Sequence, residues 1–337
     1  MVKNKIVDCD KEIEFTPKSF SGSAGSKFGV YYNDKDRIMK LPRNGRYFHD
    51  VNISYNTSPL SEYLGSHIYE ILGFDVHETL LGTYKNKVVV LCKNFDPIGN
   101  RLHEFKNIKN YFDDEDVMND DSDSTVLSDI LKVISYSPLI IDKEATFDRF
   151  WDMFLIDAFI NNNDRNNGNW GFLFDSNNLE NWKIAPIYDN GNSFNNKLGL
   201  EDINRRLKSD ETMKNIAIYS VVSAFKDDEN HRINPFKLIY LKNIDDLNKS
   251  VIRNVFKINI NYKKILNFIE NIPNKSQNGV EIISDTYKRL IKMSLNMRME
   301  EVLVPTFNEL MQYDEYKEYY DSLNAKKIFY QEDELER

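Results

Sequence analysis

The sequence contains few of the residues that build disulfide frameworks and metal clusters. Its two cysteines, Cys9 and Cys92, are far apart and form no CxxC pattern. This argues against a disulfide framework or a structural zinc site, and we expect a reducing compartment. The five histidines are scattered without HExxH spacing, so the sequence offers no zinc-protease type of site either.

Long apolar runs and an excess of positive charge are also absent. No run is long enough for a signal peptide at the start or for a membrane span, so we expect a cytoplasmic protein. A route without an N-terminal signal would still allow delivery into a host cell. The formal net charge of −9 argues against direct binding to nucleic acid, because attraction to phosphate needs a basic face.

The chain nevertheless has enough apolar residues for a sizeable core. Its 337 residues are 41% hydrophobic, which indicates a globular protein with two lobes or domains. Residues 27–42 contain two β-rich runs with a hairpin turn at 33–36. Residues 58–73 predict a helix, with Pro59 in its first turn and Gly73 at its end. Two further strand-like runs lie at residues 78–84 and 87–95.

The remainder of the chain predicts mainly helices. Residues 146–160 carry a wide apolar stripe at helical spacing, directly before an asparagine-rich loop. Two short strands are expected at residues 169–174 and 182–189, and further helices beyond about residue 200. Residues 113–123 contain seven acidic residues, which indicates a solvated loop or, as an alternative, a partner-binding segment.

Residues 21–27, SGSAGSK, form a glycine- and serine-rich stretch directly before the hairpin. Small residues let backbone N–H groups approach a phosphate closely and donate to its oxygens. The stretch matches neither the Walker A motif nor GxGxxG, so an ordinary flexible turn is the alternative. The candidates for facing a phosphate are Gly22, Ser23, Ala24, Gly25, Ser26 and Lys27.

Lys40 lies on the second strand of the predicted hairpin. It shares a strand face with Ile38, which places it toward the covered side of the sheet. There it could contact nucleotide phosphates as a point charge. A cation on this side needs an anionic partner, and Glu62 on the following helix is the candidate. A lysine at a sheet edge without such a role is the alternative.

Asp164 and Asn169 are five residues apart in the loop between the apolar helix and the next strand. In kinases this spacing puts an aspartate next to the attacking hydroxyl and an asparagine on the metal. Mg²⁺ prefers oxygen ligands and usually takes only one or two from the protein. A polar loop in a chain that is generally rich in asparagine is the alternative.

Asp189 follows an apolar strand and begins the sequence Asp-Asn-Gly, where a protein kinase has Asp-Phe-Gly. A carboxylate there would bridge Mg²⁺ to the nucleotide phosphates, although Asp-Asn-Gly is also a common turn sequence. The order of the signals is more specific than any one of them. The chain contains, in the order that a bilobal kinase requires, a glycine-rich loop, a lysine on a strand, a glutamate on a helix, an Asp-x4-Asn loop and an aspartate for the metal.

Two segments resemble the HipA-like kinases, a family of serine/threonine kinases with a divergent protein-kinase-type fold. They are NNNDRNNGNWGF at residues 161–172 and IAPIYDNGNSF at residues 184–194. The chain is most similar to a compact bacterial member of the family. The resemblance implies an α+β, bilobal protein-kinase-like fold. Its small β-rich N-terminal lobe would span residues 1–95, and its larger, mainly helical C-terminal lobe residues 96–337.

The resemblance also implies roles for single residues. Asp164 would orient or deprotonate the substrate hydroxyl, and Asn169 and Asp189 would hold Mg²⁺. Lys40, paired with Glu62, would contact the phosphates of ATP. Residues 21–27 would cover these phosphates, and the segment from Cys92 to Phe95, including Lys93, would form the hinge beside adenine.

The chain departs from full-length HipA, which has a further small domain ahead of the glycine-rich loop. This chain begins almost at the loop, which puts the antitoxin and DNA-complex role in doubt. An antitoxin-like partner and a host protein are both possible partners. HipA-type kinases can phosphorylate a loop serine, and Phe20 stands at that position here, so Ser21, Ser23 and Ser26 are the nearby candidates.

The expected function is an ATP- and Mg²⁺-dependent protein serine/threonine kinase that also phosphorylates itself. A kinase-fold enzyme acting on a small molecule or lipid is one alternative, and an ATP-binding pseudokinase used as a binding module is another. A pseudokinase usually lacks at least one catalytic residue, whereas Lys40, Asp164, Asn169 and Asp189 are all present. The sequence does not identify the protein substrate.

Overall fold

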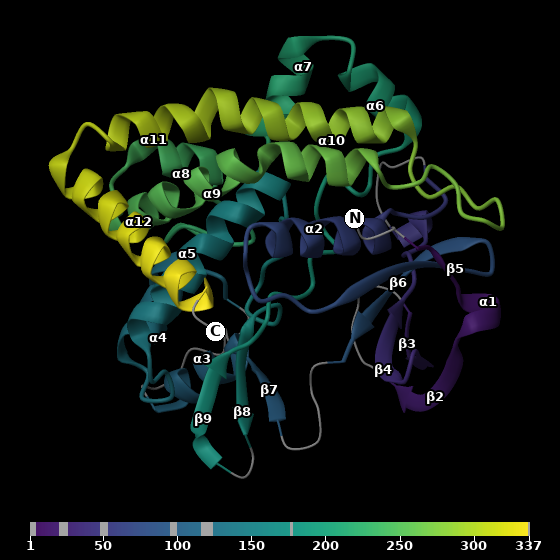
Figure 1. Ribbon diagram of the computed structural model, residues 1–337, viewed down its shortest axis with the longest axis horizontal. Helices are drawn as coiled ribbons and strands as arrows, with labels where there is room; N and C mark the ends of the chain where they lie inside the picture. Colours follow the sequence, from purple (N-terminus) through teal and green to yellow (C-terminus); the bar gives the residue numbers. More distant parts are fainter. Residues whose placement is uncertain are drawn as a thin grey trace.

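The computed structural model describes residues 5–19, 26–47, 53–94, 100–115, 124–175 and 178–335. The protein is an α+β structure in which a strand-rich part lies beside a larger, mainly helical part (Figure 1). Within the described residues, one sheet has the strand order β1-β5-β6-β4-β3-β2 and a smaller sheet has the order β7-β8-β9. The predicted fold class is confirmed.

The larger sheet contains the predicted hairpin. Asn33 and Asp34 connect its two strands with positive φ angles of 50° and 57°, which a tight type I′ turn requires and which Asn and Asp tolerate. The short strand at the N-terminal end, which the sequence analysis did not predict, pairs in parallel with β5. The strands are β1 (Val7–Asp8), β2 (Glu14–Ser19), β3 (Lys27–Tyr32), β4 (Lys35–Lys40), β5 (Thr79–Tyr84) and β6 (Lys87–Lys93).

Helix α2 (Ser58–Ile71) runs along the boundary between the two parts (Figure 1). It has Pro59 in its first turn, and Gly73 follows its end with a φ of 83°. Its apolar side packs on β5 and β6 and belongs to the main hydrophobic core with Leu81 and Val90. The opposite face of the sheet forms a second, smaller core around Met39.

Helix α5 (Lys143–Ile160) is the predicted apolar helix, and it is buried on nearly all sides. The carboxylate of Asp142 caps its start by accepting a hydrogen bond from the backbone N–H of Ala145 at 2.9 Å.

The loop after α5, which we call the 161–170 loop, leads into the smaller sheet. That sheet contains the predicted strand pair and a third strand, β7, that was not predicted. Its strands are β7 (Asn100–Glu104), β8 (Gly171–Asp175) and β9 (Asn178–Ile184).

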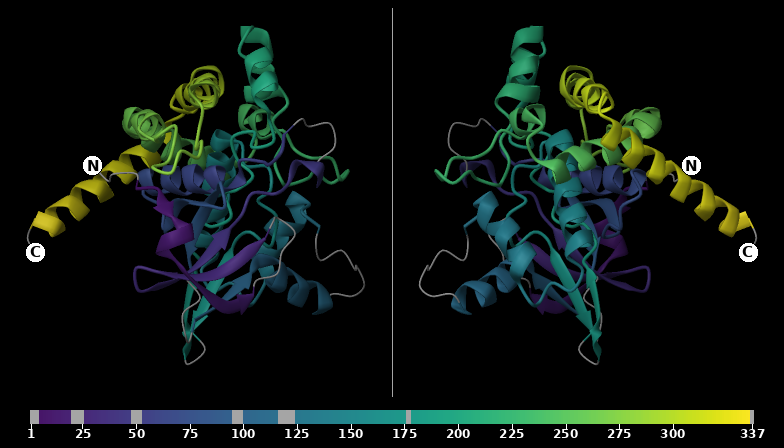
Figure 2. Two further views of the ribbon diagram at one scale, coloured as in Figure 1. Left: turned by 90° about the vertical axis from the view of Figure 1, so that its right-hand side faces the viewer. Right: turned by 90° about the vertical axis from the view of Figure 1, so that its left-hand side faces the viewer.

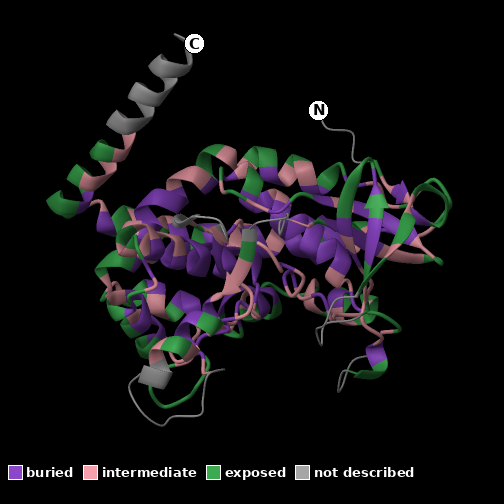
Figure 3. Cartoon of the chain, turned by 90° about the horizontal axis from the view of Figure 1, so that it is seen from below, coloured by how far each residue is buried: buried purple, intermediate pink, exposed green. Residues whose placement is uncertain are grey.

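The remaining helices form the mainly helical part, and Figure 3 shows buried residues gathered in its central helices. The last helix projects away from the body (Figure 2). The helices are α1 (Cys9–Glu12), α3 (Phe105–Glu115), α4 (Leu127–Tyr136), α6 (Leu200–Arg206), α7 (Asp210–Lys214), α8 (Pro235–Leu241), α9 (Asp245–Glu270), α10 (Asp285–Arg298), α11 (Val304–Leu310) and α12 (Asp314–Leu335), with a 3₁₀ turn η1 (Gly45–Tyr47) and π-helical segments η2 (Asn215–Tyr219) and η3 (Met299–Leu303).

Two expectations concern the surface of this part. The acidic stretch predicted as a loop begins inside α3, which continues to Glu115, while residues 116–123 lie outside the described residues. Among the helices in the described ranges, none has both the length and the apolar character to cross a membrane.

An aromatic stack holds the end of the 161–170 loop against the smaller sheet. The rings of Phe105 and Trp170 are stacked with centroids 4.1 Å apart, and Phe150 of α5 lies 5.8 Å from Trp170. Phe105 and Phe150 are fully buried. Large aromatic side chains in such contacts contribute strongly to stability, so this stack fixes the position at which the loop enters β8.

Phe105→Ala is expected to lower the free energy of unfolding by about 3–5 kcal/mol, because it removes a buried aromatic ring and leaves a cavity beside Trp170. Urea unfolding monitored by tryptophan fluorescence measures the change. Tyr111→Ala on the same helix is the control, since Tyr111 is 48% exposed, and its effect should stay within about 0.5 kcal/mol. Equal effects of the two substitutions would contradict the proposed role of the stack.

Candidate active site

A cavity of about 120 Å³ lies where β3, β4 and α2 meet the loops that follow α5 and β9. We call the second of these loops, which connects β9 to α6, the 185–199 loop. Six residues of the predicted site line the cavity: Ser26, Lys27, Lys40, Glu62, Asp164 and Asp189. Arg43, Asn192 and Lys197 line it as well, and the sequence analysis did not select them.

Lys40 connects the two parts of the molecule inside this cavity. Its Nζ lies 3.0 Å from Glu62 Oε2 and 2.9 Å from Asp189 Oδ1. Burial by itself would lower the pKa of Lys40, but the two carboxylates outweigh it and hold the pKa well above its ordinary value. The expected pair with Glu62 is present, and Asp189 is a second partner of the same ammonium group.

Glu62 is almost fully buried, with 1% of its side chain exposed. Its Oε1 accepts a hydrogen bond from the backbone N–H of Asn190 at 3.1 Å and lies 2.9 Å from His77 Nε2. Burial favours the neutral acid, yet Lys40 and His77 together hold the pKa of Glu62 below its ordinary range. The carboxylate is therefore charged and fixed by partners from three separate segments.

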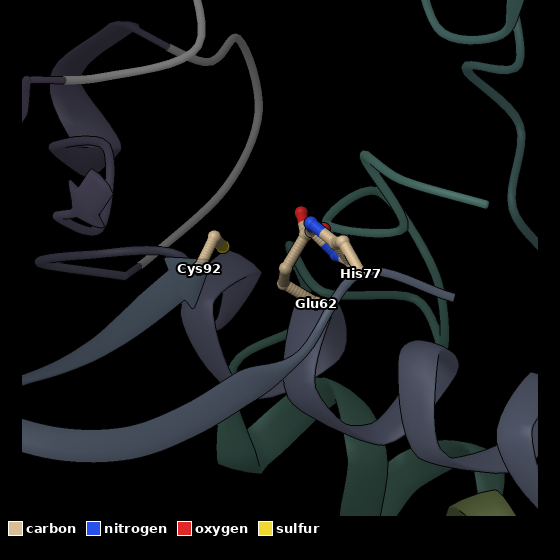
Figure 4. Close-up of side chains that lie close together, drawn as sticks. All are labelled: Glu62, His77 and Cys92. Atoms are coloured by element: carbon tan, nitrogen blue, oxygen red, sulfur yellow. The ribbon is translucent and has the colours of Figure 1, made fainter. Parts of the chain in front are cut away.

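His77 is a site residue that the sequence analysis missed. It lies just before β5, is buried, and its Nε2 is 3.1 Å from Ser66 Oγ as well as close to Glu62. Figure 4 shows the side chains of Glu62 and His77 meeting, with Cys92 beside them. The sequence gives no signal for this role of His77. Its partner Glu62 is fifteen positions earlier and on another element, the helix α2.

The side-chain donors of Glu62, His77 and Cys92 lie within 4.8 Å of one another. Such a set could in principle hold a metal ion. However, the imidazole is already used within the protein, since His77 Nε2 lies 2.9 Å from Glu62 Oε1 and 3.1 Å from Ser66 Oγ. The carboxylate of Glu62 is also engaged by Lys40 and Asn190. These contacts describe a network that positions Glu62 rather than a metal centre.

Asp164 lies in the 161–170 loop and lines the cavity. Its Oδ1 accepts a hydrogen bond from Asn166 Nδ2 at 3.2 Å, and its backbone carbonyl accepts one from Asn169 Nδ2 at 2.6 Å. Burial is the largest influence on the carboxyl and raises the pKa of Asp164, and the negative charge of Asp189 adds to the increase. The bond from Asn166 and the charge of Lys197 act in the opposite direction.

Asn169 lies next to Asp164, although it is not among the described residues that line the cavity. Because its amide nitrogen is bonded to the carbonyl of Asp164, its Oδ1 is the atom that could serve as a metal ligand. Asp189 adopts a φ of 58°, a left-handed conformation that is uncommon for residues other than glycine, although Asp tolerates it better than most. Strained backbone of this kind clusters at functional sites.

Arg165 is the second residue that the sequence analysis missed. It is 1% exposed, and its guanidinium donates to Asp157 Oδ2 at 2.8 Å and to the carbonyl of Asn169 at 2.8 Å. It also donates to the carbonyl of Tyr188 and, at 2.5 Å, to Asn190 Oδ1. One side chain thereby joins α5, the 161–170 loop and the 185–199 loop. Asp157 on the buried face of α5 is the signal that could have revealed it, since a buried carboxylate needs a cation.

Comparisons with known proteins identify the family of the chain. The profile of the HipA-like C-terminal domain matches residues 19–234, well over half of the chain. The chain belongs to the HipA-like family. The part matched includes Lys40, Asp164 and Asp189, and it ends before the last five α-helices of this HipA-like chain, α8 to α12.

A protein sequence and a crystal structure from Helicobacter pylori are similar to this chain over most of their length. The serine/threonine-protein kinase CtkA of Helicobacter pylori is 33% identical over 292 residues, which are 86% of this HipA-like chain and 84% of the relative. The crystal structure of a Helicobacter pylori proinflammatory kinase CtkA matches with a TM-score of 0.78 and 29% identity, covering 89% of this chain and 97% of that one.

A more distant structure is similar in fold alone. It is the Shewanella oneidensis toxin–antitoxin complex of HipA, HipB and operator DNA, with a TM-score of 0.52 and 12% identity. The match covers 89% of this HipA-like chain and 68% of that chain. The shared architecture is the protein-kinase-like fold expected from the sequence.

Part of the predicted nucleotide site is placed differently or lies outside the described residues. Lys93 ends β6 with an exposed side chain, and among the described residues it is not one that lines the cavity. Its backbone N–H is bonded to the carbonyl of Glu78 at 2.8 Å, so this donor is used by the sheet. Gly22, Ser23, Ala24, Gly25 and Phe95 of the predicted site lie outside the described residues.

Arg165→Met is expected to lower the free energy of unfolding by about 3–5 kcal/mol, because it leaves the carboxylate of Asp157 buried without its cation. Urea unfolding gives the change, and the double variant with Asp157→Asn measures the coupling of the pair. We expect the double variant to lose clearly less stability than the sum of the two single variants.

Arg205→Met is the matched control for this experiment. Arg205 also donates to an aspartate, Asp202, but its side chain is 70% exposed. An exposed ion pair contributes at most about 1 kcal/mol. If Arg165→Met had as small an effect as Arg205→Met, the buried guanidinium would not hold the two loops together.

Proposed function

We propose that this protein is an ATP- and Mg²⁺-dependent protein serine/threonine kinase that transfers the γ-phosphoryl group of ATP to a protein hydroxyl and to itself. One kinase domain would consist of an N-terminal lobe at residues 1–95 and a C-terminal lobe at residues 96–337. The observation that carries the proposal is the contact of Lys40 with both Glu62 and Asp189 in a cavity that Asp164 also lines. A lysine so placed is what phosphoryl transfer from ATP requires.

Asp164 would act on the acceptor. Its carboxylate lines the cavity, and it would orient the hydroxyl of the substrate and accept its proton during transfer. The bond from Asn169 to the Asp164 carbonyl and the bond from Asn166 to its carboxylate limit the movement of this group. Such positioning contributes much of the catalysis in phosphoryl transfer, which needs little covalent chemistry from the protein.

Asp189 and Asn169 fit a magnesium ion, because both offer oxygen atoms and both lie near Asp164: Asn169 donates to its carbonyl, and the charge of Asp189 raises the pKa of its carboxyl. When bound, Mg²⁺ would neutralise negative charge on the phosphates of ATP. Lys40 would contact the same phosphates while Glu62 keeps its ammonium group in place, and Ser26 and Lys27 would approach them from the start of β3. The glycines at residues 22 and 25 belong to the same proposed loop.

The protein relatives support a protein as the acceptor, since CtkA is named a serine/threonine-protein kinase. A small molecule or lipid remains the competing class of acceptor. A pseudokinase is the weaker candidate, because Lys40, Asp164 and Asp189 are present and line one cavity.

Radiolabelled ATP separates these possibilities. The purified protein is incubated with Mg²⁺ and γ-labelled ATP alone and then with a cell extract, and the labelled amino acids are identified after acid hydrolysis. We expect phosphoserine or phosphothreonine in the protein itself and in at least one extract protein. Label confined to the small-molecule or lipid fraction would support the competing class, and nucleotide binding without transfer would support a pseudokinase.

Asp164→Ala and Asp189→Ala should each reduce phosphotransfer by at least about 10²-fold, because each removes a charged group from the site of transfer. The measurement is the initial rate of label transfer, with thermal melting to confirm that each variant is folded. Asp210→Ala is the control, because Asp210 is an exposed aspartate in the first turn of α7. Near wild-type transfer by either cavity variant would refute the assignment of that residue.

The pH dependence of the reaction should follow Asp164. Since the proton acceptor must be ionised, kcat/KM should fall as the pH drops through the pKa of Asp164. Burial raises that pKa. The acid limb of the plot of kcat/KM against pH should therefore have its midpoint above about pH 3.9, the pKa of an ordinary aspartate. Asn166→Ala removes a bond that favours the carboxylate and should move the limb to still higher pH. A limb that does not move would exclude Asp164 as the titrating group.

A further inference from the structure

Lys197 lines the same cavity as Lys40, Asp164 and Asp189, although no motif in the sequence includes it. It lies eight positions after Asp189, in the 185–199 loop, and its side chain is half-buried. The transfer of a phosphoryl group beside Asp164 and Asp189 would bring additional negative charge next to two carboxylates. Such a site needs a cation near the acceptor.

The backbone that carries Lys197 is held in an uncommon conformation. Phe194 and Asn195 have φ angles of 56° and 58°, a left-handed conformation that Asn tolerates but that costs about 1 kcal/mol or more for a bulky residue such as Phe194. The N–H of Phe194 donates to the carbonyl of Ile160 at 3.0 Å, and its carbonyl accepts a hydrogen bond from Tyr287 Oη at 2.8 Å. Strain of this kind persists only where the surrounding structure determines it fully.

The residue directly before Lys197 is fixed as firmly. The side chain of Asn196 is buried and donates to the carbonyl of Gly191 at 2.6 Å. The carbonyl of Asn196 accepts a hydrogen bond from the N–H of Thr57 at 2.9 Å, just ahead of α2. The loop is therefore anchored to α5, to α10 and to the start of α2, and Lys197 enters the cavity from a rigid position.

The 161–170 loop, all of which is described, supplies no cation to the cavity. Arg165 is directed at Asp157, Tyr188 and Asn190, and the position two residues after Asp164 is the neutral Asn166. Lys40 is engaged with Glu62 and Asp189. A positive charge close to Asp164 must come from another segment of the chain, and the remaining cations among the described residues that line the cavity are Lys27, Arg43 and Lys197.

Lys197 provides this charge. Burial is the main influence on Asp164 and raises its pKa, and among the groups that lower the pKa of Asp164 Lys197 is the cation that acts most strongly. Arg232 also lies near Asp164, but its guanidinium donates to the carbonyls of Ser223 and Asn163. Arg232 is not one of the described residues that line the cavity.

From this placement we infer that Lys197 is a catalytic residue that contacts the oxygens of the phosphoryl group as it moves from ATP to the acceptor. The inference rests on the proposed kinase function and adds a residue to it. In this step the acceptor oxygen forms a bond to the γ-phosphorus, and the bond from that phosphorus to the β–γ bridging oxygen breaks. ADP leaves with the electron pair, Asp164 takes the hydroxyl proton, and no bond to Lys197 forms or breaks.

Lys197→Met should lower kcat for label transfer by about 10²–10³-fold, the loss typical of removing one donor to a developing negative charge. The KM for ATP should change less than about threefold, because the contact is made in the transition state. Lys197→Arg should recover part of the rate, since it restores the positive charge. Lys208→Met is the control, because Lys208 is exposed between α6 and α7, and it should behave as the wild type.

A transition-state analogue provides a second readout that a purely structural role would not change. Wild-type protein should bind ADP and Mg²⁺ more tightly when aluminium fluoride is present, because the fluoride complex resembles the phosphoryl group in flight. Lys197→Met should keep its affinity for ADP and Mg²⁺ and lose this gain, as measured by calorimetry. Thermal melting checks folding, and Lys197→Gln serves as the second neutral variant if Lys197→Met does not fold.

Three outcomes would overturn the inference. An unchanged kcat in a folded Lys197→Met variant would show that Lys197 does not contact the transferring group. A loss of affinity for ADP as large as the loss of kcat would assign it to nucleotide binding instead. If the wild-type protein transferred no phosphate at all, the proposed function would fail and this inference with it, a result that is distinct from an effect of the Lys197 variant alone.

Discussion

The buried guanidinium of Arg165 is the interaction on which the arrangement of the cleft depends. It holds Asp157 of α5 on one side and the carbonyls of Asn169 and Tyr188 on the other. The 161–170 and 185–199 loops have no regular secondary structure that would keep them together. Because a guanidinium has five donors in a fixed plane, one arginine can satisfy several acceptors from different segments and set their relative positions.

From Arg165 the polar contacts continue across the boundary between the two parts. Asn190 accepts from Arg165 and donates its side-chain amide to Ser66 of α2 at 3.0 Å, while its backbone N–H bonds Glu62. Glu62 in turn holds Lys40 on β4. Networks of this kind are rigid when every member is satisfied, since each unpaired buried group would cost free energy. The left-handed backbone at Asp189 is tolerated because its neighbours are fixed on both sides.

Local patterns in the sequence predicted the elements that depend on near neighbours. The hairpin turn at Asn33 and Asp34 and the apolar helix before the 161–170 loop are confirmed, because turn chemistry and helical periodicity act within a few residues. The strand β1, with two residues, is too short for a pattern and exists through its pairing with β5. The strand β7 likewise depends on β8, its partner from a distant part of the chain.

The sequence by itself determined the types of residue and their order along the chain: a lysine on a strand, a glutamate on the next helix, and two aspartates in loops. Only the tertiary structure decided that His77 supports Glu62, that Arg165 joins two loops, and that Lys197 enters the cavity while Lys93 does not. These outcomes depend on contacts between residues that are far apart in the chain. Their spacing carries no periodic signal, because folding alone brings their side chains within hydrogen-bonding distance.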